Sequence, residues 1–172
     1  SRLTPEQAMY HFISGYTAKV AGTERGVTEP QATFSACFGS PFMPLHPTVY
    51  AELLAKKIKK YKAKVWMVNT GWTGGEFGTG ERIKLRYTRK MLSEAIAGKL
   101  DKVEYVKDPI FRFQVPIQVT DVPSKVLIPR YTWDDAMEYD KKAKELAQMF
   151  VNNFKQFKSQ ASKELLSAAP RV

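Results

Sequence analysis

Cysteine and histidine are scarce in this sequence. It contains one cysteine, Cys37, and two histidines, His11 and His46, among 172 residues. A single cysteine excludes a framework of disulfides within the chain and is typical of a protein from a reducing compartment. The three side chains are widely separated and lack the paired spacing of a zinc site. We therefore expect no metal to be held by this segment alone.

Long hydrophobic runs are also missing. No apolar stretch approaches the ~20 residues that a membrane-spanning helix needs. No charged-then-apolar segment opens the chain, so no signal peptide is predicted, and we expect a cytoplasmic protein without membrane contact. The chain begins with Ser1 and has no initiator methionine, as fragments and processed chains do. Its length is sufficient for one domain with a core of its own.

Acidic residues are outnumbered by basic ones. The chain has 27 Lys and Arg against 17 Asp and Glu, which gives a net charge of +10. This balance favours anionic partners, namely nucleic acid, phosphorylated ligands or an acidic neighbouring domain. Many of the lysines lie between Lys56 and Lys64, a stretch without arginine. Lysines on an amphipathic pattern fit the solvated C-terminal end of a helix better than a nucleic-acid patch.

Capping signals predict where the helices begin. The stretch Thr4-Pro5-Glu6-Gln7 has the pattern of a capping box and predicts a first helix that runs to about Lys19. Pro47 is expected to open a second helix, Thr88 to cap a third, and Thr132 to cap the longest. The inward face of the third helix is predicted to consist of Met91, Leu92, Ala95 and Ile96.

Short strands are expected between these helices, at 65–68, 82–85, 103–106 and 111–115. Helices interspersed with a few strands predict an α/β fold, here a small mixed sheet with flanking helices. The stretch from Ala21 to Pro47 is rich in glycine and proline and predicts a long loop. Its glycines and polar first half favour an active-site lid, and an ordinary surface connection fits the composition equally well.

A glycine-rich segment follows the first predicted strand after the second helix. It reads V-N-T-G-W-T-G-G-E-F-G-T-G-E-R-I from Val68 to Ile83. The spacing from Gly75 to Gly80 fits a phosphate-binding P-loop, but Glu81 stands where the lysine must be. A dinucleotide fingerprint also fails, because no third glycine follows Gly80 at the required distance. The loop is therefore not predicted to hold phosphates.

The residues after the loop suit a purine ring. Arg82 carries a planar guanidinium that stacks on aromatic faces, Ile83 supplies an apolar wall, and Thr88 has a hydroxyl that can bond a base edge. On composition alone, an amphipathic strand edge with solvated arginines is the favoured alternative. Acids near the start of the last helix (Asp134, Asp135, Glu138), both histidines and Cys37 are interpreted as structural residues.

Several blocks, in order, resemble one enzyme family. They are Tyr10-His11-Phe12-Ile13-Ser14-Gly15-Tyr16-Thr17-Ala18-Lys19, Ala21-Gly22-Thr23-Glu24, Thr28-Glu29-Pro30, Phe34-Ser35-Ala36-Cys37-Phe38-Gly39, Leu45-His46-Pro47, Val68-Asn69-Thr70-Gly71-Trp72, Arg82-Ile83 and Ala168-Ala169-Pro170. Together they are similar to the ATP-dependent phosphoenolpyruvate carboxykinases, and the resemblance covers essentially the whole chain.

The resemblance implies a carboxy-lyase, or decarboxylase, of gluconeogenesis. Members of the family convert oxaloacetate and ATP to phosphoenolpyruvate, ADP and carbon dioxide with magnesium and manganese. Residues 1–172 resemble the C-terminal part of the two-domain enzyme, a portion of its nucleotide-binding domain. The resemblance implies that the catalytic and metal-binding residues lie in the N-terminal portion, which is then the partner of this segment. The segment alone is expected to be inactive, and a homo-oligomer is compatible with it.

The family's adenine contacts are an Arg-Ile pair after the glycine loop and a Thr five residues beyond the Ile. By resemblance these are Arg82, Ile83 and Thr88, and the mobile lid corresponds to about residues 15–34. Two other hypotheses stay open at this point. One is a basic nucleic-acid-binding module, which would form salt-sensitive complexes with oligonucleotides. The other is a truncated chain kept for assembly, without any nucleotide role.

Overall fold

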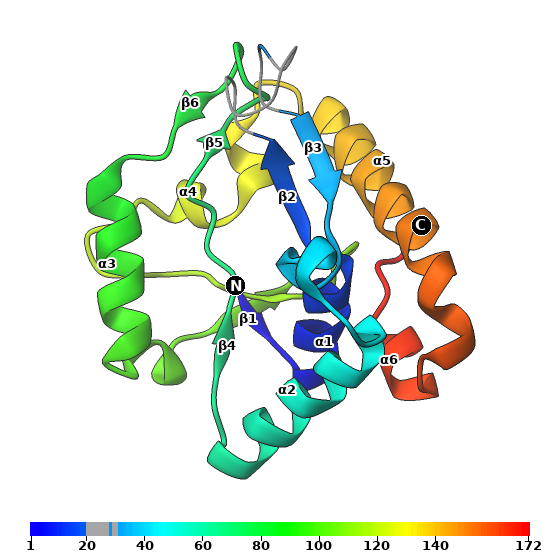
Figure 1. The fold of residues 1–172 in the computed structure, drawn as a ribbon. Helices are drawn as coiled ribbons and strands as arrows, with labels where there is room; N and C mark the ends of the chain where they lie inside the picture. The colour runs from blue at the N-terminus through cyan, green and yellow to red at the C-terminus, as the bar shows by residue number, and fades with distance from the viewer. Residues whose placement is uncertain (20–27, 29–30) are drawn as a thin grey trace. The chain divides into compact units, whose positions relative to one another are not determined.

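The computed structural model describes residues 1–19, 28 and 31–172 (Figure 1). The chain divides into two compact units. The first unit comprises Ser1–Leu3, Trp66–Ala147 and Arg171–Val172, and the second comprises Thr4–Val65 and Gln148–Pro170. Helices and antiparallel strand pairs occur together, so the expectation of mixed α and β structure is confirmed at that level.

A four-stranded sheet in the order β4-β1-β8-β7 organises the first unit. β7 and β8 are antiparallel, with Val106 opposite Val115, and β1 pairs antiparallel with β8. β4 falls within the predicted stretch 65–68, whereas β7 and β8 overlap the stretches 103–106 and 111–115 and each ends one residue later; β1 was not predicted. Their bounds are β1 (Arg2–Leu3), β4 (Val65–Trp66), β7 (Tyr105–Lys107) and β8 (Gln114–Pro116).

Helices pack beside this sheet around a small apolar core. The core cluster consists of Leu100, Val119, Val122 and Leu127, and Tyr87, Met91 and Ala95 pack against it from α3. The helical elements of this unit are α3 (Leu85–Ile96), η3 (Lys99–Lys102), α4 (Ser124–Leu127), η4 (Pro129–Thr132) and the first part of α5 (Ala136–Phe154).

The third helix begins earlier than predicted. α3 starts at Leu85, with Lys84 preceding it in extended conformation, so the prediction that Thr88 is the cap is wrong. Thr88 lies inside the first turn, where its N–H donates to the Lys84 carbonyl at 3.3 Å. The residues of α3 that face the core, Tyr87, Met91 and Ala95, are spaced four residues apart. The inward face therefore extends one turn further towards the N-terminus than predicted. Leu92 and Ile96, which were expected to face inward, are exposed.

The longest helix begins later than predicted. α5 starts at Ala136, so the prediction of a Thr132 cap is wrong. The Asp135 carboxylate accepts a hydrogen bond from the Met137 N–H at 2.7 Å and thereby caps the helix start. Thr132 ends η4 and uses its hydroxyl elsewhere, because Thr73 and Gly74 approach it from a distant part of the chain.

The second unit is built on α1, α2 and α6, with α1 packed against the other two. The capping box of α1 is confirmed: Thr4 accepts from the Gln7 N–H, and the Gln7 side chain accepts from the Thr4 N–H. α2 begins at Pro47, as predicted, and His46 caps it. The elements are α1 (Pro5–Ser14), β2 (Tyr16–Lys19), β3 (Gln31–Phe34), η1 (Ala36–Phe38), η2 (Ser40–Phe42), α2 (Pro47–Tyr61), η5 (Lys155–Gln160) and α6 (Lys163–Ser167).

The first helix ends five residues before the predicted end. Gly15 adopts the left-handed conformation (φ 58°), and its N–H donates to the His11 carbonyl. A side chain could not be placed there, because a Cβ on Gly15 would lie 1.7 Å from the Ser35 carbonyl oxygen. The chain continues as β2, which pairs antiparallel with β3. The helix predicted to reach about Lys19 is therefore wrong beyond Ser14.

Aromatic rings fill the core of the second unit. Tyr10 stacks on Phe154 with a centroid distance of 4.2 Å, and Tyr16 and Phe34 both contact Phe150. The base of the β2–β3 pair is thereby held by rings from the second part of α5. The predicted lid, residues 15–34, includes this pair, and its residues 20–27 and 29–30 lie outside the described residues.

Candidate functional site

The glycine-rich segment forms a hairpin in the first unit (Figure 1). β5 (Trp72–Thr73) and β6 (Glu81–Arg82) are antiparallel, with Trp72 opposite Arg82 and Thr73 opposite Glu81. The loop closes on itself, because the N–H groups of residues 79 and 80 both donate to the Glu76 carbonyl. A Cβ on Gly80 would lie 2.5 Å from the Gly75 carbonyl oxygen, so this turn requires glycine.

Thr132 anchors the hairpin. Its hydroxyl donates to the Pro129 carbonyl at 2.7 Å. The same oxygen accepts hydrogen bonds from the Thr73 hydroxyl at 2.7 Å and from the Gly74 N–H at 3.0 Å. Gly74 is left-handed (φ 77°), and a Cβ there would come within 2.9 Å of the Thr132 carbonyl oxygen. Sequence reasoning missed this role, since nothing local in the sequence relates Thr132 to residues some 59 positions earlier.

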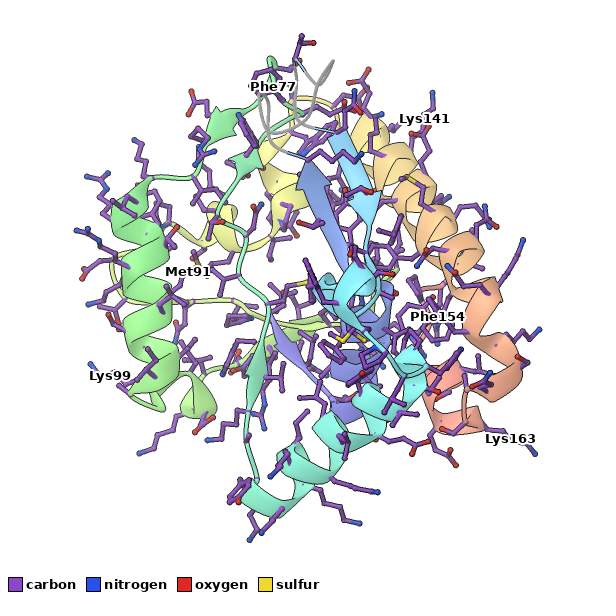
Figure 2. The ribbon with its side chains drawn as sticks, in the orientation of Figure 1. Phe77, Met91, Lys99, Lys141, Phe154 and Lys163 are labelled. Carbon is purple, nitrogen blue, oxygen red and sulfur yellow. The ribbon has the colours of Figure 1, made fainter. Side chains whose placement is uncertain are left out.

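Arg82 stacks on the ring opposite it in the hairpin. Its guanidinium carbon lies 4.7 Å from the centroid of the Trp72 ring. Phe77, near the end of the loop (Figure 2), meets the same ring edge-on at 5.4 Å. Arg82 is exposed, so this cation–π contact is worth about 0.5–1 kcal/mol. The stacking fixes the plane of the guanidinium at one edge of the hairpin.

A cavity of about 500 Å³ lies beside the hairpin. This volume lies within the range of small-molecule sites, roughly 300–1,000 Å³. The cavity is lined by Thr73, Gly74, Thr79, Gly80, Glu81, Arg82, Ile83, Lys84, Tyr87, Pro123, Lys125, Val126, Tyr131, Thr132, Trp133 and Asp134. Three cations and two carboxylates are among these residues, so the lining carries a net positive charge. We refer to it as the hairpin cavity.

The structure brings two of the three predicted site residues together. Arg82 and Ile83 both line the hairpin cavity, whereas Thr88 does not. Thr88 is buried on α3, where its side chain is only 8% exposed. Direct contact between its hydroxyl and a ligand in the hairpin cavity would require the side chain to become accessible.

Tyr87 is a wall residue that sequence reasoning missed. Its hydroxyl accepts a hydrogen bond from the Arg86 guanidinium at 3.1 Å, and this contact lowers the pKa of Tyr87. The Arg86 guanidinium also lies 4.9 Å from the ring centroid. A signal was present in the sequence, because Tyr87 continues the four-residue spacing of Met91 and Ala95 towards the N-terminus of α3.

An ion pair ties the glycine loop to α5. The Lys142 ammonium lies 2.5 Å from a Glu76 carboxylate oxygen and 3.5 Å from Glu145. The Glu76 hydrogen bond is the main cause of a raised pKa of Lys142. All three side chains are about half exposed, so the bond contributes at most about 1 kcal/mol to stability. The ion pair therefore favours the position of the glycine loop next to α5.

The other titratable residues singled out in the sequence have structural surroundings. His11 is buried edge-on against Phe150, and burial lowers the pKa of His11 to about 4. Cys37 is buried, which raises the pKa of its thiol. The lysines from Lys56 to Lys64 are exposed at and beyond the end of α2, as the solvated-helix interpretation predicted.

Metal-ligating clusters and membrane-spanning helices are both missing from the described residues. Among residues 1–19, 28 and 31–172, no three His, Cys, Asp or Glu side chains are placed together to hold a metal ion. In the same part of the chain, no helix combines the length and the apolar character needed to cross a membrane.

The chain has a mixed α/β fold, and its hairpin cavity has the volume of a small-molecule site. The model of one family, described as phosphoenolpyruvate carboxykinase, matches residues 1–125. The chain therefore belongs to the ATP-dependent phosphoenolpyruvate carboxykinase family. This confirms the resemblance seen in the sequence.

Curated relatives extend the match over the full chain. The chain is 60% identical over 171 residues to a phosphoenolpyruvate carboxykinase (ATP) of Caldanaerobacter subterraneus, and the alignment covers 99% of this chain and 33% of the relative. The protein of the same name from Flavobacterium johnsoniae is 62% identical over 170 residues, and that of Thermus thermophilus 54% over 172. The chain spans about a third of the length of these relatives. The matches give the nucleic-acid alternative no support.

Proposed function

We propose that this chain is the C-terminal, adenine-binding part of an ATP-dependent phosphoenolpyruvate carboxykinase. The observation that carries the proposal is the hairpin cavity, with Arg82 and Ile83 adjacent in its lining. The names of the relatives support the reaction, in which oxaloacetate and ATP give phosphoenolpyruvate, ADP and carbon dioxide. The enzyme would act in gluconeogenesis in the cytoplasm.

The hairpin cavity offers the adenine end of ATP two kinds of contact. Ile83 provides an apolar wall for a purine face, and the Arg82 guanidinium lies at the edge of the cavity in a plane set by Trp72. Lys84 and Lys125 add positive potential, which favours a ligand that carries phosphates. Thr88 enters the proposal through the family resemblance alone, since it is buried and does not line the cavity.

The remaining chemistry is assigned to the rest of the enzyme. Loss of carbon dioxide from oxaloacetate leaves an enolate, whose oxygen attacks the γ-phosphorus of ATP while ADP leaves. Magnesium and manganese would lower the charge barrier of that transfer. The described part of this chain has no cluster that fits them, so the metal ligands are proposed to lie in the other two thirds of the enzyme.

Residues about 15–34 are proposed to act as a lid. Exclusion of water matters for this reaction, because an exposed enolate would be protonated to pyruvate before phosphoryl transfer. The β2–β3 pair supports this role, since Gly15 and the rings around Phe150 hold its base in place. Residues 20–27 and 29–30, which belong to the proposed lid in the sequence, are outside the described residues.

The site assignment is tested with Arg82→Ala in the full-length enzyme. We expect the KM for ATP to rise at least fivefold, about 1 kcal/mol, while the KM for oxaloacetate stays the same. Arg89→Ala is the matched control, because Arg89 is an exposed arginine on α3 outside the hairpin-cavity lining. An unchanged KM for ATP in Arg82→Ala would contradict the adenine assignment and favour a chain without a nucleotide role.

A further inference from the structure

A second, smaller cavity adjoins the hairpin cavity within the first unit. Its volume is about 110 Å³. Its apolar side chains come from the core cluster and from α3, on which Met91 lies (Figure 2). The lining consists of Ser1, Trp66, Met67, Val68, Asn69, Thr73, Ile83, Met91, Ala95, Leu100, Val115, Pro116, Val119, Val126, Leu127 and Pro129. We call it the inner cavity.

Three residues line both cavities and so form the partition between them: Thr73, Ile83 and Val126. Thr73 is held in place, because its hydroxyl donates to Thr132 at 2.7 Å. Ile83 is held through its backbone, whose N–H donates to the Gly71 carbonyl at 2.9 Å. The backbone that carries the Ile83 side chain is therefore held in place, and this side chain is the largest of the three in the partition.

The chemistry and size of the inner cavity limit what it can accept. Most of the side chains that line it are apolar, so it suits an apolar group. An apolar cavity of about 150 Å³ is known to hold benzene. The inner cavity is smaller than that, so it is closed to an aromatic ring unless part of the partition is removed.

We propose that the inner cavity is an apolar extension of the nucleotide site, and that Ile83 sets the size of the base by keeping it closed. This inference rests on the proposed function, because it takes the hairpin cavity to hold the purine. The wild-type site then takes an unsubstituted purine nucleotide and excludes one that carries a bulky apolar substituent on the base. Replacing Ile83 with alanine removes three carbon atoms of the partition and joins the two cavities.

The test uses the full-length enzyme and measured dissociation constants. The probes are ATP and two derivatives that carry a benzyl group, one at N6 and one at C8 of the purine. We expect Ile83→Ala to bind at least one derivative tenfold or more tightly than the wild type does. The second change, Ala95→Leu, fills the inner cavity from α3, because Ala95 lines that cavity and not the larger one. In the double variant the gain should disappear.

Each outcome has a distinct meaning. If Arg82→Ala leaves ATP binding unchanged, the base lies elsewhere, and both the adenine assignment and this inference are overturned. If Arg82→Ala weakens ATP binding but neither derivative gains in Ile83→Ala, only this inference is overturned. A gain that survives Ala95→Leu also overturns it, since the substituent then lies outside the inner cavity.

Thermal unfolding of each variant checks that it folds. Should Ile83→Ala not fold, Ile83→Val takes its place with ethyl derivatives of ATP, and a threefold gain is expected because less of the partition is removed. No gain with either ethyl derivative would overturn the inference in that case.

Discussion

Replacement of Thr132 by valine should loosen the glycine hairpin. Valine has nearly the shape of threonine but cannot accept the hydrogen bonds from the Gly74 N–H and the Thr73 hydroxyl. Both of these bonds are partly buried, whereas the bond from Thr132 to the Pro129 carbonyl is exposed. A hydrogen bond contributes about 0.5–1.5 kcal/mol net, so the loss of two partly buried bonds amounts to about 1–3 kcal/mol.

Hydrogen exchange measures this loss where it occurs. If opening of the hairpin governs exchange of the Gly74 amide, a cost of about 1–3 kcal/mol accelerates that exchange roughly 5-fold to 150-fold. Peptides covering 72–82 should show the increase in the full-length enzyme, and Thr132→Ser should restore protection because it keeps the hydroxyl. The KM for ATP should rise in parallel in Thr132→Val, since the hairpin forms part of the cavity wall.

One result would refute this reasoning. If Thr132→Val and Thr132→Ser exchanged at the same rate over 72–82, the hydroxyl would not be what holds the hairpin. The anchoring role would then belong to packing alone.

Two further predictions concern the second unit. Gly15→Ala should destabilise it by more than about 3 kcal/mol in denaturant unfolding, because a left-handed residue there meets the Ser35 carbonyl oxygen at 1.7 Å. Gly78→Ala is the control, since it also has positive φ but open space around it, and should cost about 1 kcal/mol; equal effects would contradict the clash. His11 has its pKa lowered to about 4 by burial, so its neutral form is favoured in the folded state. Stability should therefore be unaffected by this group above pH 6.5 and fall by up to about 3 kcal/mol as the pH drops from 6.5 to 4. His11→Phe should remove that part of the pH dependence, and an identical pH profile in both proteins would show that His11 is not its source.

The starts of α1 and α2 were predictable because their capping is local. Thr4 and Gln7 bond each other across three residues, and His46 bonds the residue two positions later. The end of α1 was not predictable in the same way. The amphipathic pattern continued through Tyr16, but Gly15 meets Ser35, which lies twenty positions away in the chain. Caps predicted at Thr88 and Thr132 failed because packing of Tyr87 and bonds from Thr73 and Gly74 decided the local structure instead.

Some residues of the candidate site were likewise predictable from local sequence, and others were not. Arg82 and Ile83 are adjacent in the chain, so their chemistry and the family resemblance were sufficient to name them. The opposite wall comes from residues 123–134, and no periodicity or motif relates that segment to the hairpin. Tyr87 and Thr132 were therefore missed as site residues, although both line the cavity.

The sequence by itself determined the family, the approximate positions of the four longest α-helices and of three strands of the four-stranded sheet, and two residues of the candidate site, because these follow from short-range patterns and ordered blocks of identity. Only the tertiary structure decided that a cavity exists, which residues enclose it and which side chain separates it from a second one. The physical reason is that a cavity wall depends on contacts between segments far apart in the chain, and these are set by packing and not by local preference.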